Sequence, residues 1–192
     1  MWTLQYSSAY IQSLVTEIIR VTEKALGASA SSVLLMDFEK QELCFKFVQG
    51  SAGGMLNEAS LGAETGIAGW VARHGEPLII NDVTKDHRFC SDIDDITGFT
   101  TKSILCAPLQ ARGKTIGVIE VLNKRDGTEF DERDLQTLLA VARTATTAIE
   151  LKLAEDAIRD SENNYTTLIA NLSEKELKLF DPDPCVERET SV

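Results

Sequence analysis

The residues with the greatest potential for chemistry lie in the second half of the chain. An acidic stretch at residues 92–95 (DIDD) leads into residues 97–107 (TGFTTKSILCA), and a tight turn separates this run from residues 116–124 (IGVIEVLNK). The side chains that should share one side of the last run are Ile116, Val118, Glu120 and Leu122. A carboxylate on such a core strand is costly unless it is paired. Glu120 is therefore the most informative single position in the chain.

An enzymatic interpretation finds no support in the sequence. The two histidines, His74 and His87, neighbour no nucleophile in a recognisable motif, and the chain has no Gly-x-Ser-x-Gly elbow, P-loop or His-Glu-x-x-His sequence. Two isolated histidines also provide no metal-ligand spacing. Residues 92–95 resemble half of a calcium loop but lack its central glycine and closing glutamate. We therefore expect no catalytic residue, no metal site and no enzymatic activity.

The composition is that of a folded, acidic protein. The chain has 192 residues, a hydrophobic fraction of 43% and a formal net charge of −11. This length favours one domain of about 120–150 residues with appendages. The charge argues against nucleic acid or an anionic membrane as a partner. No apolar run reaches membrane-spanning length, and the scattered cysteines form no CxxC pair, which favours reduced thiols. We expect a soluble cytoplasmic protein.

Hydrophobic periodicity predicts an α+β fold. Helices are predicted at residues 1–27, at residues 66–73 and from Asp131 onward. Strands are predicted at residues 31–38, 42–48, 78–80, 102–108 and 115–123. A polar loop at residues 81–99 precedes the last two strands. This order predicts a mainly antiparallel sheet with helices on one face.

The run at residues 97–107, together with the strand that follows it, resembles the GAF domain family. It is most similar to the small-molecule-binding GAF modules of cyclic-nucleotide phosphodiesterases and cyclases, and the resemblance covers roughly residues 8–150. It implies a six-stranded, or nearly six-stranded, antiparallel sheet with the terminal helices packed on one face and a loop-capped pocket on the other. It also implies a regulatory sensor domain with cAMP or cGMP as the candidate ligand.

The resemblance assigns roles to seven positions. Ser32 matches a serine near the purine, and Glu120 matches an acidic residue that accepts hydrogen bonds from purine N–H groups. The backbone amides of Ile67 and Ala68 match a helix end that binds the cyclic phosphate without any basic side chain. The lid positions are matched by Asp94, Thr97 and Thr101. We expect all seven residues to converge on one cavity.

A second family signature joins an Asn-Lys pair to a downstream phenylalanine and then to Asp-Glu. Asn123, Lys124, Phe130 and Asp134 fit this signature, and the Lys124–Asp134 pair is expected to tie the last strand to the last helix. The departures from the family pattern are Leu135 in place of the final Glu, Cys90 in place of a lid aromatic, and Val48-Gln49 in place of a Phe-Asp pair beside the base.

Three functions stay open at this point. The first is the ligand-binding sensor domain, and the second is a ligand-free GAF module that dimerises and relays signals. The third is a GAF enzyme that reduces free methionine sulfoxide with loop cysteines. Cys90 lies in the right region for that chemistry, but the other cysteine motifs of that group are missing.

The sequence predicts four parts along the chain. They are an N-terminal dimerisation helix (residues 1–27), a GAF sensor domain (28–150), a C-terminal signalling helix with a PAS-like lead-in (151–180) and a frayed tail (181–192), with the output domain missing from this chain. A helical stripe from Leu135 to Leu153 that includes Ile149, beside Ile11, Leu14 and Ile18 of the first helix, predicts a parallel homodimer through the terminal helices.

Overall fold

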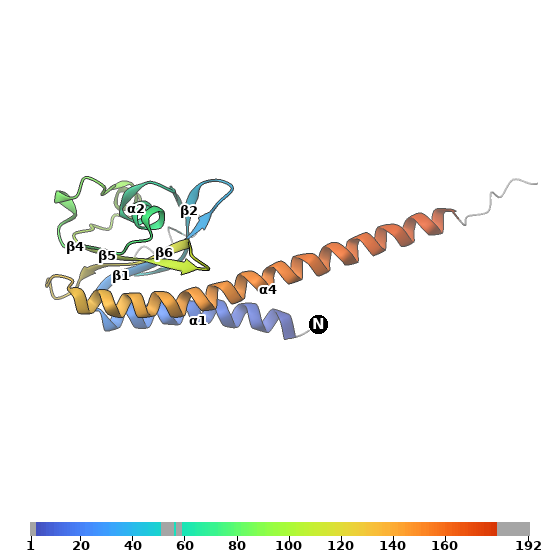
Figure 1. Cartoon of the computed structure of the whole chain (residues 1–192), viewed down its shortest axis with the longest axis horizontal. Helices are drawn as coiled ribbons and strands as arrows, with labels where there is room; N and C mark the ends of the chain where they lie inside the picture. The colour runs from blue at the N-terminus through green and yellow to red at the C-terminus, as the bar shows by residue number, and fades with distance from the viewer. Residues whose placement is uncertain (1–2, 51–55, 57–58, 180–192) are drawn as a thin grey trace, which may run out of the picture. The chain divides into compact units, whose positions relative to one another are not determined.

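The computed structural model of the chain describes residues 3–50, 56 and 59–179, and the side chains of residues 13–50, 56, 59–151 and 154–167. The chain divides into two compact units, Met1–Lys152 and Leu153–Val192. The predicted tail at residues 181–192 and the side chains of Ile11 and Leu153 lie outside the described residues. The elements in chain order (Figure 1) are α1 (Thr3–Ala25), β1 (Ala28–Asp37), β2 (Glu42–Gln49), β3 (Ser60–Gly62), α2 (Gly66–His74), β4 (Leu78–Ile80), the 3₁₀ helix η1 (Val83–Lys85), α3 (Asp92–Thr97), β5 (Ile104–Ala111), β6 (Lys114–Lys124) and α4 (Glu132–Leu179).

A six-stranded sheet in the order β3-β2-β1-β6-β5-β4 organises the first unit. Every neighbouring pair of strands is antiparallel. The predicted α+β fold with a six-stranded antiparallel sheet is confirmed. The strand that the sequence did not reveal is β3, which pairs with β2 through Leu61 and Leu43. Its three residues are Ser60, Leu61 and Gly62, so no apolar run marks this strand, whereas β4 consists of Leu78, Ile79 and Ile80.

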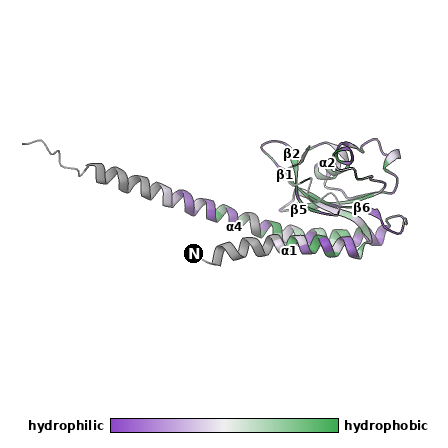
Figure 2. Ribbon diagram, turned by 180° about the vertical axis from the view of Figure 1, so that it is seen from behind, coloured by the Kyte–Doolittle hydropathy of each residue, from purple (hydrophilic) through white to green (hydrophobic). Residues whose placement is uncertain are grey.

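Helix α1 and the beginning of α4 cover one face of this sheet (Figure 1). Val33 in β1, Leu105 in β5 and Ile119 in β6 are fully buried on that face. The helices contribute Val15, Ile19, Leu135, Leu138, Ala142, Ala145 and Ile149 to the same cluster. Figure 2 shows hydrophobic residues on the parts of α1 and α4 that lie along the sheet. The prediction that the terminal helices pack on one face is therefore confirmed.

The beginning of α4 is fixed by a reciprocal cap. Asp131 Oδ1 accepts hydrogen bonds from the amides of Arg133 and Asp134 at 2.8 and 3.0 Å, and Asp134 Oδ2 accepts one from the Asp131 amide at 3.0 Å. These bonds satisfy amides that the helix itself leaves without a partner. Asp134 also forms the predicted ion pair with Lys124, with Nζ and Oδ2 2.6 Å apart. The last strand is thereby tied to the last helix.

The opposite face of the sheet carries α2 and a long segment, residues 81–103, that we call the lid. Leu34, Cys106 and Val118 are fully buried on this face, and α2 packs against them. The lid contains η1 and α3, where the sequence predicts an irregular polar loop. Helix α3 has only six residues, three of them acidic, so it shows no apolar periodicity.

Two apolar residues face differently from the prediction. Ile116 is expected on the side of Glu120, but it packs with the helix-side cluster. Leu109 pairs with Gly117 whereas Gln110 pairs with Thr115, so Ile116 is an extra residue that shifts the alternation, as in a β-bulge. Ile149 is expected to contact a helix of the partner copy in a homodimer. It is instead 2% exposed and lies in the core of its own domain. Helical spacing reveals an apolar stripe without showing which surface covers it.

Candidate functional site

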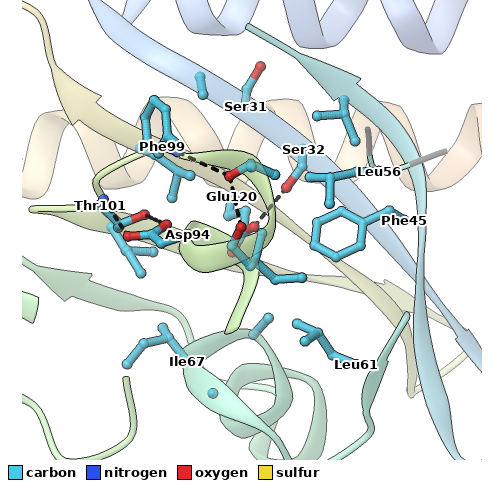
Figure 3. A pocket seen from close by; sticks show the side chains of 18 of the residues that line it. Ser31, Ser32, Phe45, Leu56, Leu61, Ile67, Asp94, Phe99, Thr101 and Glu120 are labelled. Atoms are coloured by element: carbon cyan, nitrogen blue, oxygen red, sulfur yellow. Dashed lines mark hydrogen bonds between the residues drawn. The ribbon is translucent and has the colours of Figure 1, made fainter. Parts of the chain in front are cut away.

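A pocket lies between the second face of the sheet, the first turn of α2 and the lid (Figure 3). It holds about 760 Å³ of empty space, part of which is open to solvent. Its walls are mostly apolar with a few polar groups, which is typical of small-molecule sites. The residues predicted from the sequence all line it: Ser32, Ile67, Ala68, Asp94, Thr97, Thr101 and Glu120. The fold brings them together, and their contact with a ligand stays a prediction.

Glu120 and Ser32 form a buried polar pair in this pocket. The two residues are directly opposite each other on β6 and β1, and Ser32 Oγ donates a hydrogen bond to Glu120 Oε1 at 2.7 Å (Figure 3). Glu120 is 9% exposed. Burial raises the pKa of Glu120, the hydrogen bond from Ser32 opposes that effect, and the charge of Asp94 raises the pKa further. Among the described residues no hydrogen-bond donor reaches Oε2, so this oxygen can accept from a ligand.

The polar residues of the lid first of all support the lid itself. The carboxylate of Asp94 accepts hydrogen bonds from both the amide and the hydroxyl of Thr101, each at 2.7 Å. Thr97 Oγ1 donates to the carbonyl of Ile93 at 2.8 Å and accepts from the amide of Phe99 at 3.2 Å. A ligand would therefore share these groups with the lid, and its binding would depend on how the lid is folded.

The first turn of α2 forms one end of the pocket. Gly66, Ile67 and Ala68 line the pocket at this end, and the first amide with a partner in the preceding turn is that of Gly69, which donates to the Thr65 carbonyl at 3.1 Å. The side chain of Thr65 makes no capping bond. Open amides at a helix N-terminus carry a partial positive charge and bind anions. This end of α2 can therefore hold a negative group.

Aromatic side chains line the pocket in addition to the predicted residues. Phe45 reaches it from β2, and Phe89 and Phe99 reach it from the lid. Cys90 stands where the family pattern has a lid aromatic, and Cys90 also lines the pocket. Phe99 lies within residues 97–107, the run that carries the family resemblance, so the sequence could have indicated it as an aromatic residue of the pocket. Such rings can stack on a planar heterocycle.

The polar side chains of the pocket carry carboxyl, hydroxyl, amide and thiol groups. None of its described lining residues is basic or a histidine. Within the described part of the chain, no group of three or more His, Cys, Asp or Glu side chains is arranged to hold a metal ion. Burial, with a smaller effect from Glu120, raises the pKa of the Cys106 thiol well above its usual value, so this thiol stays protonated.

No helix in the described residues has both the length and the hydrophobicity needed to cross a membrane.

These features define an α+β domain with one face for helix packing and a loop-capped pocket on the other. A model of the GAF domain family matches residues 11–149. The chain belongs to the GAF domain family.

The relatives of this chain include cyclic-nucleotide phosphodiesterases. It is 30% identical over 172 residues to a probable 3′,5′-cyclic phosphodiesterase of Caenorhabditis elegans, with 85% of this chain and 24% of that protein covered. It is 37% identical over 119 residues to the dual 3′,5′-cyclic-AMP and -GMP phosphodiesterase 11A of Takifugu rubripes, with 59% and 13% covered. The chain thus spans less than a quarter of the length of either relative.

Solved structures support the fold. The GAF domain of a phosphoenolpyruvate-protein phosphotransferase from Coxiella burnetii superposes with a TM-score of 0.69 at 17% identity, and the match covers 80% of this chain and 94% of that one. An identity this low supports the architecture alone.

Proposed function

We propose that this chain is a regulatory sensor domain of a signal-transduction protein and that its pocket binds a cyclic nucleotide, cAMP or cGMP. The observation that carries the proposal is the pocket itself. It combines a buried carboxylate, Glu120, with the open amides of Ile67 and Ala68 at the first turn of α2. A ligand that suits these two groups has hydrogen-bond donors on one part and a negative charge on another.

Recognition divides between these two ends. The amides of α2 take the cyclic phosphate, because they supply positive charge without a basic side chain. Glu120 accepts hydrogen bonds from N–H groups of the purine, and Ser32 holds the carboxylate in place at 2.7 Å. The rings of Phe45 and Phe99 offer stacking surfaces for the base. The proposal gains support from relatives that are named as cyclic-nucleotide phosphodiesterases.

We further propose that the domain itself is not catalytic and that catalysis or output lies in other parts of a longer protein. The GAF segment would occupy residues 28–150, and residues 151–180 would form a signalling helix. The scattered cysteines and the acidic composition support a cytoplasmic location.

A thermal-shift measurement of the full chain tests the binding proposal. The chain is titrated with cAMP, with cGMP and with 5′-AMP, which has a terminal instead of a cyclic phosphate. At a concentration of 100 times the dissociation constant, a ligand adds about 2.7 kcal/mol to the apparent free energy of unfolding. No shift with either cyclic nucleotide at millimolar concentration would contradict the ligand identity.

A second candidate function is dimerisation through the terminal helices, with or without ligand. Leu14 and Val21 of α1 are large apolar side chains that are 38% and 51% exposed. Val21 also lines a groove between the two helices, together with Ile18 of α1 and Val141 of α4. An exposed apolar surface of this kind on two neighbouring helices suits the helices of a second copy. We propose a homodimer through this surface.

A further inference from the structure

The first end of the lid is attached to Phe130, which stands two residues before α4. Asn81 Nδ2 donates to the carbonyl of Phe130 at 3.1 Å, and the amide of Phe130 donates to Asn81 Oδ1 at 2.8 Å. Phe130 is 3% exposed in the helix-side core. It is followed directly by Asp131, whose carboxylate caps α4. A single side chain thus joins the start of the lid to the start of the last helix.

The other end of the lid is held in the same manner by Asn123, near the end of β6. Asn123 Oδ1 accepts hydrogen bonds from the amides of Lys102 and Ser103 at 2.7 and 3.0 Å, and Nδ2 donates to the carbonyl of Thr100 at 2.8 Å. Asn123 has a φ of 52°, a left-handed conformation that asparagine tolerates better than most residues. The next residue, Lys124, forms the ion pair with Asp134 in the first turn of α4.

The two ends of the lid are also joined to each other. The amide of Val83 donates to the carbonyl of Lys102 at 3.0 Å, which closes the base of the segment. The lid residues that line the pocket lie between these points and are Phe89, Cys90, Ile93, Asp94, Thr97, Phe99 and Thr101. The lid is therefore a closed loop with two attachments. One attachment is at Phe130, next to the capping residue Asp131. The other is at Asn123, next to Lys124, which forms the ion pair with Asp134.

We propose that Asn81 and Asn123 are positioning residues that couple the lid to the first turn of α4, so that the lid and the helix start change conformation together. A lid that moved away from the sheet would have to break the bonds to Phe130 or carry that residue with it. Because Phe130 adjoins the cap, the second course disturbs the first turn of α4. This inference rests on the proposed function in that it gives the ligand-binding pocket a route to the last helix.

The alternative is that both asparagines only stabilise the fold. A double-mutant cycle separates the two roles, because residues that act independently have additive effects and coupled residues do not. The readout is amide hydrogen exchange, followed by mass spectrometry, on the full chain without ligand. Asp131→Ala removes the cap, and Asn81→Ala removes the first attachment.

If the coupling exists, Asp131→Ala speeds exchange in residues 86–100 of the lid about fivefold or more, as expected for the loss of a hydrogen bond. In the Asn81→Ala background the lid exchanges faster already, and the loss of the cap adds nothing further there. The matched control is Gln110→Ala, which removes another side-chain bond to a backbone carbonyl, that of Gly75. This control leaves exchange in the lid unchanged.

The coupling is wrong if Asp131→Ala speeds exchange only within α4, or if the effects of the two substitutions on the lid simply add. Should Asn81→Ala fail to fold, Asn81→Asp keeps the acceptor for the Phe130 amide, and the same cycle decides. Titration with cAMP and cGMP separates this inference from the proposed function. Binding without coupled exchange contradicts the coupling, whereas coupled exchange without binding contradicts the nucleotide proposal.

Discussion

Ser32 of β1 and Glu120 of β6 are cross-strand partners, and the 2.7 Å hydrogen bond between them lies inside the pocket. Both side chains are more than nine-tenths buried. A carboxylate in such a place costs free energy unless a partner compensates for the lost water. The sheet holds this carboxylate in one orientation before any ligand arrives, and a preorganised acceptor loses less entropy on binding.

Substitution of Glu120 by alanine tests its role as the acceptor for a heterocycle. We expect Glu120→Ala to weaken the binding of cAMP or cGMP by about 1–3 kcal/mol, the cost of leaving a buried donor of the ligand without its charged partner. Isothermal titration calorimetry measures the change. Glu76→Ala, at an exposed position outside the pocket, serves as the control and should bind as the wild type does. Equal affinity of Glu120→Ala and wild type would remove Glu120 from the site.

The pH dependence of stability reports on the same carboxyl group. Burial raises the pKa of Glu120 in the folded protein above the ordinary value of 4.5, so the unfolded chain releases this proton at lower pH than the folded one. The stability that this group contributes is therefore present below pH 4.5 and is lost as pH rises through the folded pKa. Glu120→Gln cannot titrate. Its stability relative to wild type should rise with pH above 4.5 and then level off.

Urea unfolding of both proteins, from about pH 4 to about pH 8, measures this difference. The exposed Glu76→Gln variant should follow the wild type over the whole range. A difference between Glu120→Gln and wild type that does not depend on pH would show that the carboxyl group titrates normally.

The proposed homodimer depends on the exposed apolar residues of α1. We expect Leu14→Glu with Val21→Glu to give a folded monomer in multi-angle light scattering, because both side chains are partly exposed and their replacement leaves the core intact. Ile149→Glu should instead unfold the domain, since Ile149 is 2% exposed. Lys24→Glu, at an exposed position of the same helix, is the control for added negative charge. A wild-type chain that stays monomeric at high concentration would refute the dimer.

Gly117 tests how closely β6 packs against β1. A Cβ atom at this position would lie 2.2 Å from the carbonyl oxygen of Leu34, and backbone cannot yield as a side chain can. We expect Gly117→Ala to destabilise the domain by about 1–3 kcal/mol or more. Gly127→Asn is the matched control, because a side chain there meets nothing within 4 Å and asparagine tolerates its φ of 74°. Thermal unfolding compares the two, and equal melting temperatures would contradict the close packing.

The sequence by itself determined the parts of this protein that depend on local pattern. Alternation along residues 118–122 placed Glu120 on the buried side of β6, where it lies. Helical spacing located α1 and α4, and the predicted start of the last helix at Asp131 lies one residue before the observed one. These features follow from periods of two and of 3.6 residues, which a single strand or helix imposes on its own side chains.

Only the tertiary structure decided how distant residues meet. The bulge at Ile116 arises from the pairing of β6 with β5, and the burial of Ile149 depends on the sheet beneath α4. The bonds between Asn81 and the backbone of Phe130 join positions 49 residues apart. No local pattern encodes such contacts, because each depends on the register and packing of several elements at once. The sequence therefore determined which elements form, and the packing of those elements decided what the pocket is connected to.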